Sequence, residues 1–244
     1  MKESEEQYKE AYNRAEFYKD LLSHDVTNIL QSIVFSAESG LLLLDEKEKL
    51  KAKLVDIKDQ VKRSGKLISN VRKLSKLEKE APLLKVIDVK EVLKNTTELI
   101  QRTTHEKTVN IRIEAPEHKL YIQGNELLRD VFENLIQNAV KYNHNPVVEI
   151  VIRINSIQDI EKKHLKLEFM DNGIGIIEKS KWAIFDRGYR VDGNIGGRGL
   201  GLSLVKKIVN SYKGQIWVED KIEGDFSKGS NFIIEIPEGN PRLG

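Results

Sequence analysis

The stretch NLIQNAVKY, residues 134–142, lies in the most regular helical pattern of the 244-residue chain. Asn134, Asn138 and Lys141 are spaced i, i+4 and i+7, so they share one face of a helix. A separate apolar set accompanies them: Leu128, Val131, Leu135 and Ala139. Two amides and an ammonium on one face suit a hydrated Mg²⁺ ion with phosphate groups, because amide oxygen is a hard ligand and lysine neutralises phosphate charge. An ordinary polar helix face fits the pattern equally well.

Two glycine-rich segments follow this helix. DNGIG, residues 171–175, comes directly after a predicted strand, where Asp171 can accept a hydrogen bond from an exocyclic amine and the glycines let backbone approach a flat ring. GGRGLGLS, residues 196–203, opens a predicted helix whose amide groups and dipole attract anions. It is not a Rossmann motif, because no strand leads straight into it, and it lacks the Gly-Lys-Ser/Thr of a Walker A motif.

In this order the segments resemble the catalytic ATP-binding domain of sensor histidine kinases, a member of the GHKL ATPase superfamily. NLIQNAVKY is similar to the family's N box, DNGIG to its G1 box, Phe185 with Tyr189-Arg190 to its F box, and residues 197–201 to its G2 box. The resemblance covers roughly residues 84–237. It implies a Bergerat-type two-layer α/β sandwich with a mobile lid between the F and G2 boxes.

The resemblance also implies a site for ATP and Mg²⁺. Asn138 would be the metal ligand, with Asn134 nearby. Lys141 and Arg190 would contact phosphate, and Asp171 would bind the adenine amine. The nucleotide-binding residues implied in this way are Asn134, Asn138, Lys141, Tyr142, Asp171, Gly173, Gly175, Ile176, Phe185, Arg190, Gly197, Arg198, Gly199, Leu200, Gly201 and Leu202.

One position of the N box separates branches of the superfamily. ATP-hydrolysing relatives carry a glutamate general base four residues before the metal-binding asparagine, and this chain has Asn134 there. Glu133 is adjacent, but on a helix it points about 100° away. A site that lacks a base to activate water favours phosphoryl transfer to another nucleophile over hydrolysis.

The N-terminal third predicts two helical arms. Residues 1–80 contain no proline, and apolar or aromatic residues recur at steps of three or four. The two stripes are Tyr8, Tyr12, Ala15, Tyr18, Leu22, Val26, Ile29 and Ile33, and then Leu50, Leu54, Ile57, Val61, Ile68, Val71 and Leu74. Gly40 and the charged run 45–49 mark the turn. We therefore expect an antiparallel hairpin that forms a four-helix bundle as a homodimer, because two arms alone bury little apolar surface.

The pattern changes after Pro82, so we place domain boundaries at residues 1–81 and 82–244. Short alternating strands and amphipathic helices then predict an α+β fold for the chain as a whole. The expected strands are 84–89, 110–114, 120–123, 147–154, 165–170, 215–219 and 231–236, and the expected helices are 89–101, 126–142 and 202–212.

His24 stands apart from the other four histidines. The first arm's stripe uses Leu22 and Val26, so His24 points outward, with Asp25 beside it and Asn28 one turn later. A neutral imidazole supplies a nucleophilic lone pair, and an adjacent carboxylate can orient the ring and accept its proton. Plain helix surface is the commoner explanation of His-Asp-x-x-Asn alone, and the ATP domain downstream favours the acceptor.

SHDVTNIL, residues 23–30, resembles the H box of histidine-phosphotransfer domains, with Thr27 and Ile29 replacing the usual arginine and proline. Without that proline the expected kink is lost. The resemblance implies a kinase that autophosphorylates His24, with Asp25 and Asn28 as catalytic residues. It further implies phosphate transfer to a response-regulator aspartate and a phosphatase activity on that partner, which we expect to dock near Gln31 and Ser32. A GHKL-type ATPase, a kinase of another residue, and a non-catalytic nucleotide-sensing scaffold remain alternatives.

Composition limits the partners. With 40 basic and 38 acidic residues, the composition gives no reason to expect bulk attraction to nucleic acid or membrane, and without cysteine the chain holds no disulfide or thiolate metal site. No apolar run approaches the ~18 residues that a membrane span needs. We therefore expect a cytoplasmic chain, either on its own or as the cytosolic part of a membrane-anchored sensor.

Overall fold

The computed structural model describes residues 12, 26–80, 82–104, 107–158, 163–186 and 200–239. By its contacts the chain divides into two units, Met1–Arg72 and Lys73–Gly244, and each is described by itself. The division falls inside a helix, nine residues before the boundary expected at Pro82. The extent of the two domains as independent folding units stays a prediction.

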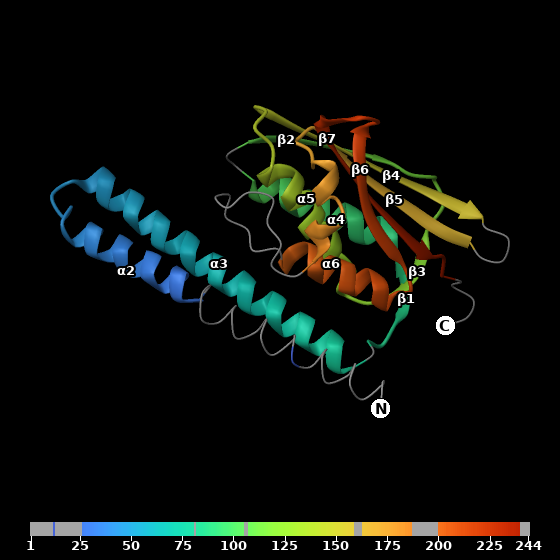
Figure 1. Ribbon diagram of the computed structural model, residues 1–244, viewed down its shortest axis with the longest axis horizontal. Coiled ribbons are helices and arrows are strands. Elements are labelled where there is room, and N and C mark those ends of the chain that lie inside the picture. The colour runs from blue at the N-terminus through green and yellow to red at the C-terminus, as the bar shows by residue number, and fades with distance from the viewer. Residues whose placement is uncertain are drawn as a thin grey trace. The chain divides into compact units, whose positions relative to one another are not determined.

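The described part of the first unit is a helical hairpin. Helix α2 (Thr27–Leu41) and helix α3 (Lys47–Lys79) are joined by a turn at 42–45, where the sequence places it. The helices approach closely at Gly40, where an added Cβ would lie 3.3 Å from Leu50 Cδ1. Figure 1 shows the two helices side by side.

The hairpin leaves much of its apolar stripe uncovered. Ile29 is buried on α2, but Leu30 is 56% exposed. On α3, Leu54, Val61 and Ile68 recur at seven-residue steps and are more than half exposed. The three α3 positions lie on the stripe that the sequence assigns to a bundle core, and the described residues of the hairpin leave them exposed.

The second unit is an α/β sandwich. Its strands are β1 (Lys85–Asp88), β2 (Thr108–Glu114), β3 (Tyr121–Gly124), β4 (Val147–Gln158), β5 (Lys163–Asp171), β6 (Gln215–Ile222) and β7 (Asp225–Pro237). Its helices are α4 (Val89–Thr103), α5 (Leu128–Lys141) and α6 (Leu200–Ser211), with short 3₁₀ turns η2 (Glu178–Ser180) and η3 (Ala183–Phe185). Each expected strand and helix is present, with bounds shifted by up to six residues. The α+β fold class is confirmed.

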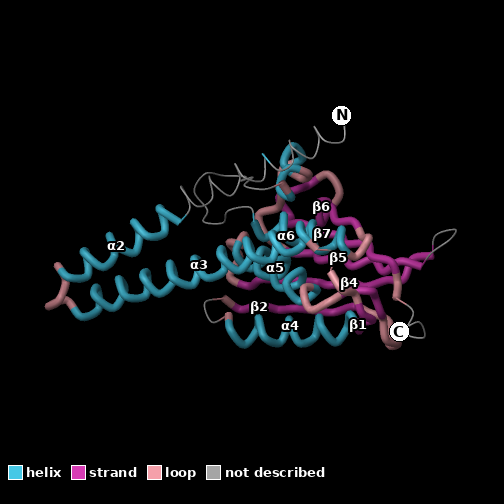
Figure 2. The backbone as a smooth tube through the Cα atoms, turned by 90° about the horizontal axis from the view of Figure 1, so that it is seen from below, coloured by secondary structure: helices cyan, strands magenta, loops and turns pink. Residues whose placement is uncertain are grey.

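The main sheet has the order β2-β4-β5-β7-β6 and is antiparallel except for the parallel pair β2–β4. β1 and β3 form a separate antiparallel pair. Figures 1 and 2 show α4, α5 and α6 along one face of the main sheet. Alternate residues of β4 and β5, such as Ile152 and Leu167, face these helices and are fully buried, which makes the two layers share one core.

Among the described residues, no helix combines the length and the apolar character that crossing a bilayer requires.

Candidate nucleotide-binding site

Asp171 ends β5 with its side chain only 5% exposed. Its Oδ1 accepts hydrogen bonds from the backbone amides of Gly173 (2.7 Å) and Ser230 (3.3 Å). Within the described part of the chain, no hydrogen bond reaches Oδ2. Burial raises the pKa of this carboxyl above its ordinary value, while the two amides and the charge of Lys221 act in the opposite direction. The carboxylate is held rigidly through one oxygen, and the other is left to accept a bond from a ligand.

Two glycines bring backbone segments into direct contact around this carboxylate. Gly175 has a φ of 70°, and a Cβ there would lie 1.6 Å from the carbonyl oxygen of Phe226. Gly229 has a φ of 116°, and its Cβ would lie 2.1 Å from the carbonyl oxygen of Asp171. Any side chain at either position would force the loop after β5 away from β7.

Asn134 and Gly201 bring helix α5 and the start of helix α6 together. Asn134 is 6% exposed on α5, and its Nδ2 donates to the carbonyl of Asp130 at 2.7 Å. A Cβ at Gly201 would lie 2.7 Å from Asn134 Oδ1, so only glycine lets the start of α6 approach α5 this closely. Asn138 is one turn further along the same face and is half-buried, so its amide can still reach a ligand.

Glu133 is engaged elsewhere. Its Oε1 accepts from Arg129 Nε at 2.6 Å, in an ion pair one helical turn apart. The residue on the buried face of α5 is therefore the Asn134 amide, as the sequence predicts, and the neighbouring carboxylate is paired on the helix surface.

The end of α5 meets the loop after β5. The Ile174 amide donates to the carbonyl of Tyr142 at 3.0 Å, and a Cβ at Gly173 would lie 2.6 Å from the same oxygen. Lys141 Nζ lies 4.8 Å from the centroid of the Tyr142 ring, a cation–π distance. Residues expected at a nucleotide are thus gathered from two elements that are 30 positions apart in sequence.

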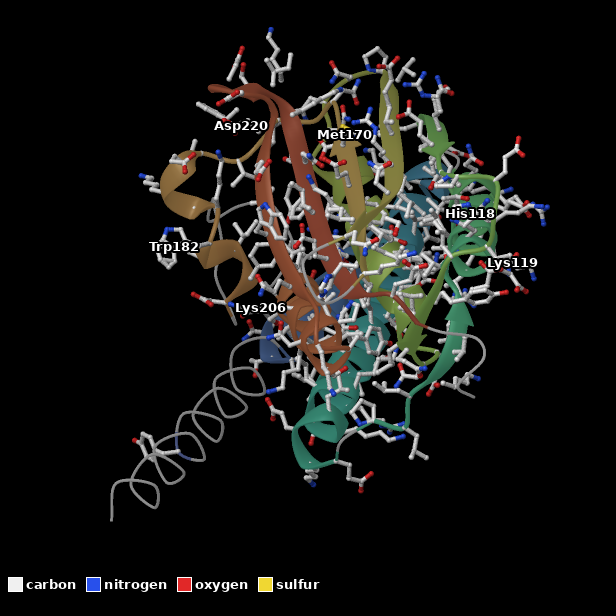
Figure 3. All side chains as sticks on the ribbon, turned by 90° about the vertical axis from the view of Figure 1, so that its right-hand side faces the viewer. His118, Lys119, Met170, Trp182, Lys206 and Asp220 are labelled. Atoms are coloured by element: carbon white, nitrogen blue, oxygen red, sulfur yellow. The ribbon has the colours of Figure 1, made fainter. Side chains whose placement is uncertain are left out.

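The segment around Phe185 is held by a buried aromatic contact and by two ion pairs of Lys181. Phe185 is 5% exposed and meets Phe232 edge-on, with ring centroids 6.2 Å apart. Lys181 forms ion pairs with Glu178 (2.5 Å) and Asp220 (2.9 Å), which raise the pKa of its ammonium. Figure 3 shows Trp182 projecting from this segment, with Asp220 on β6 nearer the end of the sheet. Phe185 therefore contributes to the core, and any role at a nucleotide is through the backbone that it holds.

Several predicted site residues are not part of this geometry. His24, Asp25, Arg190, Gly197, Arg198 and Gly199 lie outside the described residues, as does the expected lid. Asn28 lies on the exposed face of α2, Leu200 is buried, and Ile176 and Leu202 are half-buried. Sequence reasoning missed Ser230 and Gly229, which close around Asp171 from β7. In the sequence they form a Gly-Ser pair just before the expected strand 231–236, and such a pair is too common to mark a site.

Three comparisons identify relatives of the chain. The family model described as "Histidine kinase-, DNA gyrase B-, and HSP90-like ATPase" matches residues 123–240. Sensor protein kinase WalK of Staphylococcus epidermidis is 28% identical over 241 residues, 95% of this chain and 38% of that protein. Sensor histidine kinase WalK of Bacillus subtilis is 35% identical over 140 residues, 55% of this chain and 22% of that one. The chain thus spans well under half the length of these relatives.

The solved structure of histidine kinase ThkA in complex with response regulator protein TrrA shares the fold, with a TM-score of 0.68 at 22% identity over 96% of this chain and 66% of that one. The N box, the G1 box and the part of the G2 box that the structure describes meet within the region that the family model matches. The second unit therefore contains a domain of the family described as "Histidine kinase-, DNA gyrase B-, and HSP90-like ATPase", and the chain as a whole is similar to sensor histidine kinases.

Proposed function

We propose that the chain binds ATP with Mg²⁺ and transfers the γ-phosphate to His24 of a homodimer. The observation that carries the proposal is Asp171, whose Oδ1 is fixed by two backbone amides beside a helix that presents amides instead of a catalytic carboxylate. The free oxygen suits the exocyclic amine of adenine, which only donates. Without a water-activating base at Asn134, transfer to a protein nucleophile is favoured.

The residues present fit the two cofactors. Asp171 and the close backbone at Gly173 and Gly175 fit a flat base, and the half-buried Asn138 would ligand Mg²⁺ through its amide oxygen. The ion, when bound, neutralises charge on the transferring phosphoryl group. Lys141 would turn from the Tyr142 ring toward the phosphates, and Arg190 would join it there.

The proposed phosphate acceptor and the proposed dimer interface both belong to the helical unit. His24 is the proposed nucleophile, Asp25 the group that orients the imidazole and takes its proton, and Asn28 the residue that positions water for a phosphatase step. The exposed positions Leu54, Val61 and Ile68 support a homodimer, because a second hairpin would cover them. The phosphorylated His24 would then pass its phosphate to a response-regulator aspartate. The ThkA structure, solved with a response regulator, makes such a partner the natural expectation.

Labelling with ATP carrying a radioactive γ-phosphate tests this proposal. His24→Ala is expected to abolish an acid-labile, base-stable label, because the only acceptor is removed. His118→Ala, which changes another exposed histidine, is expected to label as the unchanged chain does. If His24→Ala labels normally, the acceptor assignment is wrong.

The metal role has its own test. Asn138→Ala is expected to reduce labelling by about 100-fold or more, since removal of a group that stabilises the transferring phosphoryl costs about 3 kcal/mol. Gln137→Ala, which changes the exposed residue just before Asn138 on α5, serves as the matched control. Retained labelling in Asn138→Ala at limiting Mg²⁺ would contradict the assignment.

A further inference from the structure

Three asparagines connect the end of α5, the start of β4 and the loop after β5; we refer to Asn143, Asn145 and Asn172 as the asparagine clamp. Asn172 Oδ1 accepts from Asn143 Nδ2 at 2.7 Å and from the Glu149 amide at 2.8 Å, while its Nδ2 donates to the Val147 carbonyl at 3.1 Å. The side-chain amide of Asn172 thus makes three hydrogen bonds, two as acceptor and one as donor.

Asn145 adds two further hydrogen bonds to the clamp. Asn145 Nδ2 donates to the backbone carbonyl of Asn172 at 2.5 Å, and the Asn145 amide donates to Asn143 Oδ1 at 2.9 Å. Asn143 is fully buried, and Lys107 Nζ donates to its carbonyl and to that of Val140 at the end of α5. A cation at a helix C-terminus is favourable, so this end of α5 is held by charge as well as by hydrogen bonds.

The clamp lies between the groups that the proposed function assigns to the nucleotide. Asn172 lies between Asp171 and Gly173 in the chain. Asn143 directly follows Tyr142, whose carbonyl accepts a hydrogen bond from the Ile174 amide. The spacing between the base-reading carboxylate and the C-terminal end of α5 is therefore set by the Asn143–Asn172 bond and its neighbours. Neither asparagine is expected to contact the nucleotide itself.

We infer that Asn143 and Asn172 are positioning residues for base selection, holding Asp171 where it accepts from adenine and repels guanine. Guanine carries a carbonyl oxygen where adenine carries its amine, so a correctly placed carboxylate favours adenine on electrostatic and hydrogen-bonding grounds. This inference rests on the proposed function, because it requires that Asp171 binds the base. A displaced loop would bind both nucleotides more evenly.

The test is the ratio of dissociation constants for ATP and GTP, measured by calorimetry on the whole chain. Asn172→Ala removes three hydrogen bonds and leaves the Glu149 amide and Asn143 Nδ2 without their acceptor. We expect its ATP affinity to fall by about tenfold, the equivalent of roughly one such bond, with a much smaller fall for GTP. Asn143→Ala is expected to change the ratio in the same direction by a smaller factor, and the double variant by less than the product, because the two side chains share a bond.

Asn155→Ala is the matched control, since Asn155 is exposed at the far half of β4. A purely structural role would lower the fraction of folded chain, which the calorimetric stoichiometry reports, and would leave the ATP-to-GTP ratio unchanged. Asn172→Asp covers the case in which Asn172→Ala fails to fold, because it keeps an oxygen for the Asn143 and Glu149 donors and replaces the donor to Val147 by a carboxylate oxygen, which repels that carbonyl. The same direction of change is expected. An unchanged ratio in the folded clamp variants overturns the inference alone. If the unchanged chain itself bound ATP no better than GTP, the proposed function would fall together with it.

Discussion

The hairpin and the sandwich handle their apolar residues in opposite ways. In the sandwich, Ile152, Leu167 and Ile234 are covered completely by helices of the same unit. In the described part of the hairpin, Leu54, Val61 and Ile68 stay more than half exposed, although they follow the same kind of periodic pattern. The difference teaches that the sandwich closes its own core, whereas the described residues of the hairpin leave part of their apolar stripe uncovered. The fold thereby separates a nucleotide-binding part from a part suited to assembly.

The largest effect is expected in the proposed dimer interface of the hairpin. Val61→Asp places one carboxylate per copy in the proposed interface, and each buried unpaired charge costs several kcal/mol. Sedimentation velocity should show the homodimer weakened by at least about 100-fold. Lys62→Asp, at the neighbouring exposed position, should stay dimeric. A stable Val61→Asp dimer would mean that this stripe is not the interface.

The sandwich is expected to be most sensitive where backbone segments meet. Gly175→Ala should lower the free energy of unfolding by about 3 kcal/mol, combining the cost of a left-handed residue with the overlap at Phe226. Gly224 also has a positive φ, of 78°, but nothing lies within 4 Å of a Cβ there. Gly224→Ala therefore measures the backbone cost alone in the same urea titration. Equal losses in the two variants would remove the argument for close contact at Gly175.

Asp171→Asn separates binding from stability within the sandwich. Loss of a charged acceptor should weaken ATP binding by about 10–100-fold. Because the folded carboxyl has a raised pKa, its contribution to stability is greatest at low pH and is lost as the pH rises through that pKa. Asparagine does not titrate, so thermal melts should show the stability of the variant rising relative to that of the unchanged chain as the pH increases above the ordinary pKa of an aspartate. A variant that instead loses stability as the pH rises would contradict the direction of this shift.

The smallest effect is expected at the first residue of the second unit. Lys73 Nζ pairs with Asp130 on α5, with both side chains partly exposed. Lys73→Gln should lower the unfolding free energy of the sandwich by about 0.5–1 kcal/mol, the usual range for such a pair. Lys76→Gln, one turn later on α3, should have no measurable effect. If both variants behave alike in chemical denaturation, the pair does not stabilise the second unit.

Several features follow from local pattern and are therefore present in the sequence by itself. Periodicity and turn residues predict both described arms of the hairpin, the seven strands and the three longer helices of the sandwich, because amphipathic spacing and backbone preferences act over a few residues. The same local signals mark Asn134, Asp171 and Gly201 as candidates, since each occurs in a short motif that chemistry constrains.

Contacts between distant segments required the tertiary structure. Ser230 and Gly229 approach Asp171 only because β5 and β7 are neighbours in the sheet, and Asn143 meets Asn172 only because the end of α5 lies beside the loop after β5. These pairs are 29 to 59 positions apart, so no local pattern links them. The sequence determines which residues can bind a nucleotide, and the packing of strands and helices decides which oxygen of Asp171 is held and which is left for a ligand.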